Sequence, residues 1–266
     1  MRYGFIGLGN MGSSIARGMS GSGKFMVDEI CGYNRSPEKT EVLSREIGLI
    51  PCRDASEVVS SSQTIILCVK PQQMKDAIGS VQGSAFEGKL VITIAAGLPI
   101  SYYQSVLPPS ARIVRAMPNL NAGCLESVTG ICASSNATEG DLSAARLVFE
   151  SIGTVYSIDE SMISAFSAVA GASPAFTFMY IDALAMAGVE AGMTRAQAQK
   201  AAAEAVMGTC RTLLESGEHP DVLRDRVCSP GGTTIEGVKV LEEGSFKGTV
   251  MDAVDAVIRK DRSLKK

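Results

Sequence analysis

Residues 3–12 read Tyr-Gly-Phe-Ile-Gly-Leu-Gly-Asn-Met-Gly, and this stretch decides the fold. Its first four residues form a short apolar run, which predicts a buried strand, and Met11–Ser20 then carries apolar residues at helical spacing. Between them, Gly7 permits a tight turn, Gly9 lets the backbone approach a pyrophosphate, and Gly12 lets helix and strand pack closely. The pattern predicts a dinucleotide-binding turn at a helix N-terminus; a glycine-rich turn that holds no ligand is the alternative.

Short apolar runs and helical segments alternate through the first half of the chain. This rhythm is typical of βαβ units and predicts an α/β fold with a mainly parallel, doubly wound sheet. The expected strands are Tyr3–Ile6, Glu29–Tyr33, Thr64–Val69, Leu90–Ile94, Arg112–Met117, Val128–Ala133 and Gly153–Ser157.

The pattern changes after about residue 160. From Met162 to Ser263 the sequence contains no convincing strand, only helical stretches rich in Ala and Met that are broken at Gly- and Pro-containing turns. We therefore expect a nucleotide-binding domain over residues 1–160 and an all-helical second domain over residues 161–266.

One apolar stretch raises the question of a membrane. Between Met162 and Val189 the only charged residue is Asp182, and an uncharged run of this length is typical of membrane spans. The segment Gly171-Ala172-Ser173-Pro174 interrupts the stretch, however, which favours a helix covered by its own domain or by a second subunit. No membrane partner is expected.

Composition excludes several classes of protein. The 25 basic and 28 acidic residues give a net charge of −3, so the electrostatic footprint of a nucleic-acid-binding protein is missing. Seven scattered cysteines and a single histidine predict neither a disulfide framework nor a metal site. With no signal-peptide pattern at the start, we expect a cytoplasmic protein. His219 precedes Pro220 and is interpreted as a structural residue that flanks a helix.

The choice of nucleotide is indicated at the end of the second expected strand. Proteins that bind NAD usually place an acidic residue there to accept hydrogen bonds from the ribose. Here the residues are Asn34-Arg35-Ser36, and an arginine beside two small polar side chains attracts a 2′-phosphate. The sequence favours NADPH, with NADH as the alternative.

Three further segments lie where a ligand would meet the chain. Val69-Lys70-Pro71 and Ala95-Ala96-Gly97 each end an expected strand, at the edge where parallel sheets bind ligands. Ser229-Pro230-Gly231-Gly232-Thr233-Thr234 forms a tight turn before a helix, and its N–H groups and hydroxyls suit a carboxylate. A helix cap without a ligand is the alternative for this turn.

Together these motifs resemble the pyrroline-5-carboxylate reductase family over essentially the whole chain. The resemblance rests on segments 5–11, 69–71, 95–97, 117–119, 182–185, 219–220, 229–235 and 241–242. It implies reduction of 1-pyrroline-5-carboxylate to L-proline by NADPH or NADH, a Rossmann-type domain, and a helical domain that forms a homodimer or larger homo-oligomer.

The resemblance also assigns the site residues. Thr234 is implied as the catalytic residue, with its hydroxyl near the ring nitrogen. The substrate carboxylate is assigned to Ser229, Gly231, Gly232, Thr233 and Thr234. The cofactor is assigned to Gly7, Leu8, Gly9, Asn10, Met11, Asn34, Arg35, Ser36, Val69, Lys70, Pro71, Ala95, Ala96, Gly97 and Asn119. The chain departs from the family at Ala172-Ser173 and at Leu120-Asn121, and neither change removes a group that the chemistry requires.

Three rival functions can be compared with this one. A β-hydroxyacid dehydrogenase uses a lysine on the first long helix after its nucleotide domain; residues 162–192 contain no lysine, which argues strongly against this function. A reductase of six-membered cyclic imines is not separated by sequence from one of five-membered imines. A non-catalytic NADP-binding sensor would explain the glycine motif but not the threonine turn.

Overall fold

The computed structural model describes residues 2–263, so Met1 and the basic pair Lys265-Lys266 lie outside the described residues. Contacts divide the chain into two compact units. The sheet unit comprises Met1–Gly171 with Val257–Lys266, and the helical unit comprises Ala172–Ala256.

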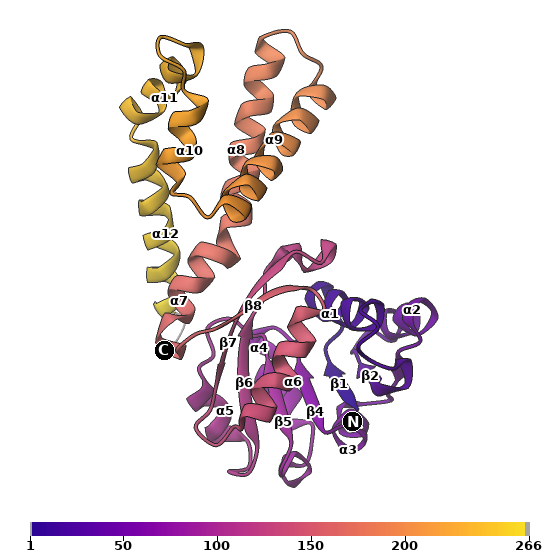
Figure 1. The fold of residues 1–266 in the computed structure, drawn as a ribbon. Coiled ribbons are helices and arrows are strands. Elements are labelled where there is room, and N and C mark those ends of the chain that lie inside the picture. The colour runs from indigo at the N-terminus through magenta and orange to yellow at the C-terminus, as the bar shows by residue number, and fades with distance from the viewer. Residues whose placement is uncertain (1, 264–266) are drawn as a thin grey trace. The chain divides into compact units, whose positions relative to one another are not determined.

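Within the described residues, the sheet unit holds one eight-stranded sheet in the order β3-β2-β1-β4-β5-β6-β7-β8 (Figure 1). Neighbouring strands are parallel except β6 and β7, which are antiparallel, so the predicted doubly wound sheet is confirmed. The strands are β1 (Tyr3–Ile6), β2 (Ile30–Tyr33), β3 (Ile50–Pro51), β4 (Thr64–Leu67), β5 (Leu90–Thr93), β6 (Arg112–Met117), β7 (Ser127–Ala133) and β8 (Gly153–Ser157). The sequence did not predict β3, because its two residues are too few to show a period.

Helices cover both faces of this sheet (Figure 1). Successive strand residues alternate between two separate cores: in β4, Ile66 belongs to one core, whereas Ile65 and Leu67 belong to the other. Burial on both faces explains why the strands read as continuous apolar runs. The helices are α1 (Asn10–Gly21), α2 (Pro37–Ile47), α3 (Ala55–Ser61), α4 (Pro71–Gly79), α5 (Ile100–Val106), α6 (Glu139–Glu150) and α7 (Ile163–Phe166).

The chain reverses its strand order at β1. This strand pairs with β2 on one side and with β4 on the other, so the helices that follow β1 and β4 leave on opposite faces. Such a reversal opens a crevice at the carboxyl ends of the strands, where α/β sheets bind ligands. The loop after β1 that lies at this crevice is the glycine motif.

The helical unit contains α8 (Ser173–Glu190), α9 (Arg195–Ser216), α10 (Pro220–Val227), α11 (Thr233–Glu243) and the first part of α12 (Phe246–Ser263). No strand occurs between Met162 and Ser263, as the sequence predicts. Helices α8 and α9 form a hairpin, in which a Cβ added at Gly188 would lie 3.0 Å from the Cβ of Ala198. Asp182 and Arg195 form an ion pair across this hairpin.

The boundary between the two compact units lies between Gly171 and Ala172. The sequence places the domain boundary earlier, at residue 160. Two features join the intervening residues to the sheet unit. Ile163 is fully buried in the same core as α3, α4 and α5. The Ser164 hydroxyl donates a buried hydrogen bond of 2.7 Å to Asp261, near the end of α12. The functional division at residue 160 stays a prediction.

Candidate functional site

The glycine loop between β1 and α1 has the geometry of an anion cradle. Gly7 has a φ of +96°, which side chains rarely permit. A Cβ added at Gly12 would lie 2.4 Å from the carbonyl oxygen of Gly7, so helix and loop touch through bare backbone. A Cβ added at Gly9 would meet nothing within 4 Å, and no side chain caps α1 at this residue. The first N–H groups of α1 therefore have no side-chain cap, and an anion can bind at a helix start of this kind.

Asn34 holds this loop against the end of β2. Its side-chain oxygen accepts a hydrogen bond of 3.0 Å from the N–H of Leu8, and its side-chain nitrogen donates one of 3.1 Å to the carbonyl of Ser36. The N–H of Gly7 also donates to the carbonyl of Tyr33, at 2.9 Å. The Asn34 side chain thus shapes the cradle by joining two loops.

A cleft of about 410 Å³ opens beside the glycine loop. Seven residues that the sequence assigns to the cofactor line it: Gly7, Gly9, Asn34, Arg35, Ser36, Val69 and Lys70. They come from the ends of three neighbouring strands, β2, β1 and β4, as expected for a doubly wound sheet.

The other predicted cofactor residues do not line this cleft; they are Leu8, Asn10, Met11, Pro71, Ala95, Ala96, Gly97 and Asn119. Leu8 is fully buried in the core beneath the loop. The Asn119 side chain is engaged elsewhere, because its nitrogen donates 2.9 Å to the carbonyl of Ala170 and its oxygen accepts 3.2 Å from the N–H of Asn121. Ala95, Ala96 and Gly97 follow β5, the next strand beyond β4.

The cleft also includes residues that the sequence analysis missed. Lys39 lies in the first turn of α2, just after the Asn-Arg-Ser segment. Gln73 and Asp76 lie on α4 and Ser80 caps its C-terminus, at spacings of three and four residues that place them on one side of the helix. The remaining lining residues are Ile6, Tyr33, Ala55, Cys68 and Ala77. Since α4 begins at Pro71, directly after Val69-Lys70, the helical period of this segment was a signal that could have identified these cleft residues.

Positive charge predominates in the cleft lining. Arg35, Lys39 and Lys70 are cationic, and Asp76 is the one carboxylate among the lining residues. Burial raises the pKa of the Cys68 thiol, so this thiol stays neutral and adds no negative charge next to the glycine loop. The cleft therefore favours a ligand that carries several negative charges.

The threonine turn lies in the helical unit. Helix α11 begins at Thr233, and its first N–H groups receive no side-chain cap. The turn is closed by a 2.9 Å hydrogen bond from the N–H of Gly232 to the carbonyl of Ser229, and a Cβ added at Gly232 would lie 2.3 Å from the Ser229 hydroxyl. Thr233 and Thr234 are both exposed. An uncapped helix start with exposed hydroxyls can bind a carboxylate.

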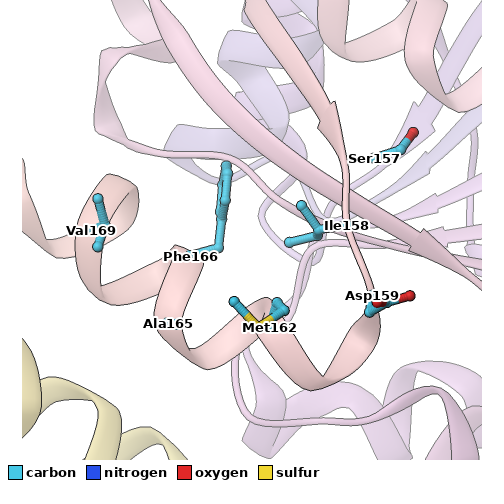
Figure 2. Close-up of a pocket in the computed structure, with 7 residues that line it drawn as sticks. All are labelled: Ser157, Ile158, Asp159, Met162, Ala165, Phe166 and Val169. Carbon is cyan, nitrogen blue, oxygen red and sulfur yellow. The ribbon is translucent and has the colours of Figure 1, made fainter.

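A second hollow, of about 680 Å³, differs in chemistry from the cleft. Met162, Phe166 and Val169 project from a helical segment, and Ile158 comes from the chain that leaves β8 (Figure 2). Its complete lining is Ser157, Ile158, Asp159, Met162, Ala165, Phe166 and Val169. With no cationic group in this lining, the hollow does not suit a dinucleotide.

His219 has the structural role that the sequence indicates. It caps the start of α10, where its Nδ1 atom accepts a hydrogen bond of 3.2 Å from the N–H of Asp221. This contact confirms the interpretation of His219 as a helix-flanking residue.

The residues present fit a dinucleotide. The cradle at Gly9 is open, α1 has no cap, and the cationic side chains line the same cleft. The sheet and this cleft together define a dinucleotide-binding protein of the Rossmann type. A fold of this type supports many reactions, so comparison with known proteins decides the family.

Family models match both parts of the chain. The model described as "Pyrroline-5-carboxylate reductase dimerisation" matches residues 160–264, and the model described as "NADP oxidoreductase coenzyme F420-dependent" matches residues 2–97. A pyrroline-5-carboxylate reductase of Escherichia coli is 40% identical over 265 residues, which cover 100% of this chain and 98% of the relative. A pyrroline-5-carboxylate reductase of Arabidopsis thaliana is 36% identical, covering 99% and 95%.

Solved structures agree. A pyrroline-5-carboxylate reductase from Coxiella burnetii superposes with a TM-score of 0.93 at 29% identity, covering 100% of this chain and 98% of the other. The Plasmodium falciparum pyrroline carboxylate reductase, solved with NADP bound, has a TM-score of 0.90 at 27% identity and covers 100% and 98%. The chain belongs to the pyrroline-5-carboxylate reductase family.

Proposed function

We propose that the chain reduces 1-pyrroline-5-carboxylate to L-proline, the last step of proline biosynthesis, with a hydride from NAD(P)H. The observation that carries this proposal is the full-length match to pyrroline-5-carboxylate reductases in a chain that keeps both an open glycine cradle and an uncapped threonine turn.

In this proposal the glycine loop and the start of α1 hold the pyrophosphate. Arg35 and Lys39 provide cations, and Ser36 a hydroxyl, for a ribose 2′-phosphate. The absence of a carboxylate at position 34 favours NADPH over NADH. The NADP-bound structure of the Plasmodium falciparum relative supports this choice.

The nicotinamide end is assigned to the carboxyl ends of the next strands. Val69, Lys70 and Pro71 follow β4, and Ala95-Ala96-Gly97 follows β5. When bound, the reduced nicotinamide supplies the hydride. Small side chains and glycine at the end of β5 leave the backbone accessible to a planar ring. Leu8, Asn10, Met11 and Asn119 complete the proposed cofactor set.

The threonine turn is assigned to the substrate. The N–H groups at the start of α11, with Ser229, Gly231, Gly232 and Thr233, would bind the carboxylate. The Thr234 hydroxyl would orient the ring nitrogen and relay its proton. The imine is protonated before reduction, so the hydride adds to the imine carbon, the C=N bond becomes single, and the nitrogen keeps its proton in the amine.

This chemistry needs no strong acid from the protein. A protonated imine already accepts hydride readily, and orientation with exclusion of water provides most of the acceleration. Thr234 alone is too weak an acid to supply the proton. The proposed site accordingly depends on backbone N–H groups and a hydroxyl.

We also propose that the helical unit forms a homodimer or a larger homo-oligomer. The family model for dimerisation, which matches residues 160–264, supports this assembly. A functional division into residues 1–160 and 161–266 is part of the same proposal. All seven cysteines are free thiols, which supports a reducing, cytoplasmic location.

The decisive experiment follows NADPH oxidation at 340 nm with purified protein. We expect oxidation that depends on added pyrroline-5-carboxylate, is faster with NADPH than with NADH, and yields proline. Parallel reactions with the six-membered cyclic imine measure ring-size selectivity. NADPH binding without any imine-dependent oxidation would refute the proposal and favour the non-catalytic sensor.

A further inference from the structure

Arg115 lies in the middle of β6 and is fully buried. It pairs with Thr93 of β5 on one side and with Cys132 of β7 on the other. Arginine is seldom fully buried unless it is paired, because removing its charge from water is costly. Neither the core nor the proposed chemistry explains this side chain.

The pairing of Arg115 is incomplete. Its Nη1 atom donates a hydrogen bond of 3.0 Å to the Oε1 atom of Glu160. Its Nε and Nη2 atoms are buried and have no partner among the described residues. Two buried N–H donors without a partner lower the stability of the core, so packing alone does not account for this arginine.

The partner oxygen has a second role. The Oε1 atom of Glu160 also accepts a hydrogen bond of 2.7 Å from the N–H of Ile100, the first residue of α5. Pro99, the residue at the cap position, has no side-chain hydrogen bond to this helix. Glu160 therefore caps α5 from sixty residues away, and its negative charge lies at the positive end of the helix.

The loop that joins β5 to α5 is also held at its β5 end, next to Arg115. Thr93, directly opposite Arg115, shares a buried hydrogen bond of 2.6 Å with the hydroxyl of Tyr103 in α5. The N–H of Ala95 donates to the same threonine oxygen, at 3.4 Å. Burial raises the pKa of Tyr103 and of Cys132 to about 12, so both groups stay neutral and Glu160 supplies the negative charge.

We propose that Arg115 is a positioning residue for hydride transfer: through Glu160 it fixes the start of α5, and with it the loop 95–99, of which Ala95-Ala96-Gly97 is assigned to the nicotinamide. This inference rests on the proposed function, because that function gives the loop its role. Arg115 touches neither cofactor nor substrate in this assignment; it acts through the carboxylate that caps the helix.

The test compares four single variants and the double variant that combines Arg115→Met with Glu160→Ala. Arg115→Met removes the guanidinium, and Glu160→Ala removes the shared acceptor. Glu160→Gln keeps an oxygen that can accept from the N–H of Ile100. Arg112→Met is the matched control. Arg112 is the first residue of β6 and also pairs with a carboxylate, that of Asp141.

Three quantities are measured for the folded fraction of each variant: kcat, the Kd of NADPH, and the Kd of 2′-phosphoadenosine 5′-phosphate, which has no nicotinamide. We expect Arg115→Met and Glu160→Ala each to lower kcat about ten- to a hundredfold, as displaced reacting groups do. The double variant should lose no more than the worse single variant, because both act through one contact. Glu160→Gln should recover to within about threefold of the parent, and the fragment Kd should not change.

Two results would overturn the inference. One is an unchanged kcat in folded Glu160→Ala or, if its unpaired Arg115 prevents folding, in the double variant, which leaves no buried charge without a partner. The other is an equal loss of affinity for the fragment and for NADPH, which would indicate general damage to the cleft. If the parent enzyme does not reduce the imine, the proposed function fails, and the ratio of the two Kd values still reports whether Arg115 positions the nicotinamide end.

Discussion

The sheet unit and the helical unit differ in how many of their large apolar side chains they bury. The sheet unit buries two cores with large residues from both faces of its sheet. In residues 172–256 of the helical unit, the buried apolar residues are three alanines: Ala185, Ala198 and Ala202. The large apolar side chains that this unit exposes include Phe178, Met179, Met186, Met207, Leu214 and Met251. The sheet unit thus encloses two cores of its own, whereas the helical unit exposes apolar surface that a partner would cover.

The composition of α8 explains the difference. This helix is apolar on nearly every side, so a single neighbour such as α9 cannot cover it. Residues 160–190 are also long and apolar enough to cross a membrane, by length and composition only. The match of residues 160–264 to a dimerisation model favours a second copy of the chain as the cover.

The largest expected effect comes from a charge on the exposed surface of α8. Met179→Asp places a carboxylate on a side chain that is 73% exposed in the single chain and covered in the proposed dimer. We expect the dimer Kd to rise by about a thousandfold, about 4 kcal/mol, because an unpaired buried charge is costly. Sedimentation equilibrium measures this Kd.

The matched control tests the contrast between the units directly. Met26→Asp makes the same change at a methionine that is 65% exposed on the sheet unit, and its dimer Kd should not change. An equal rise of the dimer Kd in Met179→Asp and Met26→Asp would contradict the assignment of the dimer interface to the helical unit. NADPH affinity should survive in both variants, since the cleft lies within the sheet unit.

The next effect concerns the cradle. Gly9→Val fills open space without a backbone clash, so the fold should persist while the pyrophosphate is excluded. We expect the Kd of NADPH to rise about a hundredfold, about 2.7 kcal/mol, by fluorescence titration. Gly21→Val, at the other end of α1 and also in open space, is the control. An unchanged Kd of NADPH in Gly9→Val would show that the pyrophosphate does not bind at this loop.

A smaller effect is expected in the threonine turn. Thr234→Ala should lower kcat about ten- to a hundredfold, less than the loss of a full general acid because the imine is already protonated, and leave the Kd of NADPH unchanged. Thr212→Ala is the control, because its hydroxyl on α9 bonds only the helix carbonyl of Gly208. Steady-state kinetics with saturating NADPH measures both. Full turnover by Thr234→Ala would reject its proposed role.

The smallest expected effect concerns the Asp141 carboxyl, whose partners all lie within the sheet unit. Burial alone would raise the pKa of the Asp141 carboxyl, but hydrogen bonds from Thr138 and Arg112 outweigh it and hold the pKa below its ordinary value. A depressed pKa means that the stabilisation is present above the ordinary pKa of about 4 and is lost as the pH falls through the folded value. Asp141→Asn should cost about 1–2 kcal/mol at pH 7, as caps do, and less near pH 3.

Urea unfolding between pH 3 and pH 7 measures this difference. Glu139→Gln, in the same first turn of α6, should stay within about 0.5 kcal/mol of the parent. The loss in Asp141→Asn should be independent of protein concentration, because its contacts are intramolecular. A gap that widens toward low pH would contradict the sign of the pKa shift.

Local patterns predicted seven of the residues that line the cleft. The spacing of Gly7, Gly9 and Gly12 identified the cradle, because these glycines act within a single turn. The cationic Lys39 was missed although it lies close to Ser36, since only the turn into α2 brings it into the cleft. Asn34 was expected to contact the cofactor, and no sequence period shows that its side chain holds Leu8.

By itself, the sequence determined the doubly wound sheet, the glycine cradle, the helical second half and the resemblance to the family. Each of these depends on residues that are neighbours along the chain. Only the tertiary structure decided that Glu160 caps a helix that begins at Ile100 and pairs with the buried Arg115. Such contacts join strands and helices far apart in sequence, and only the order of the strands in the sheet brings them within hydrogen-bonding distance.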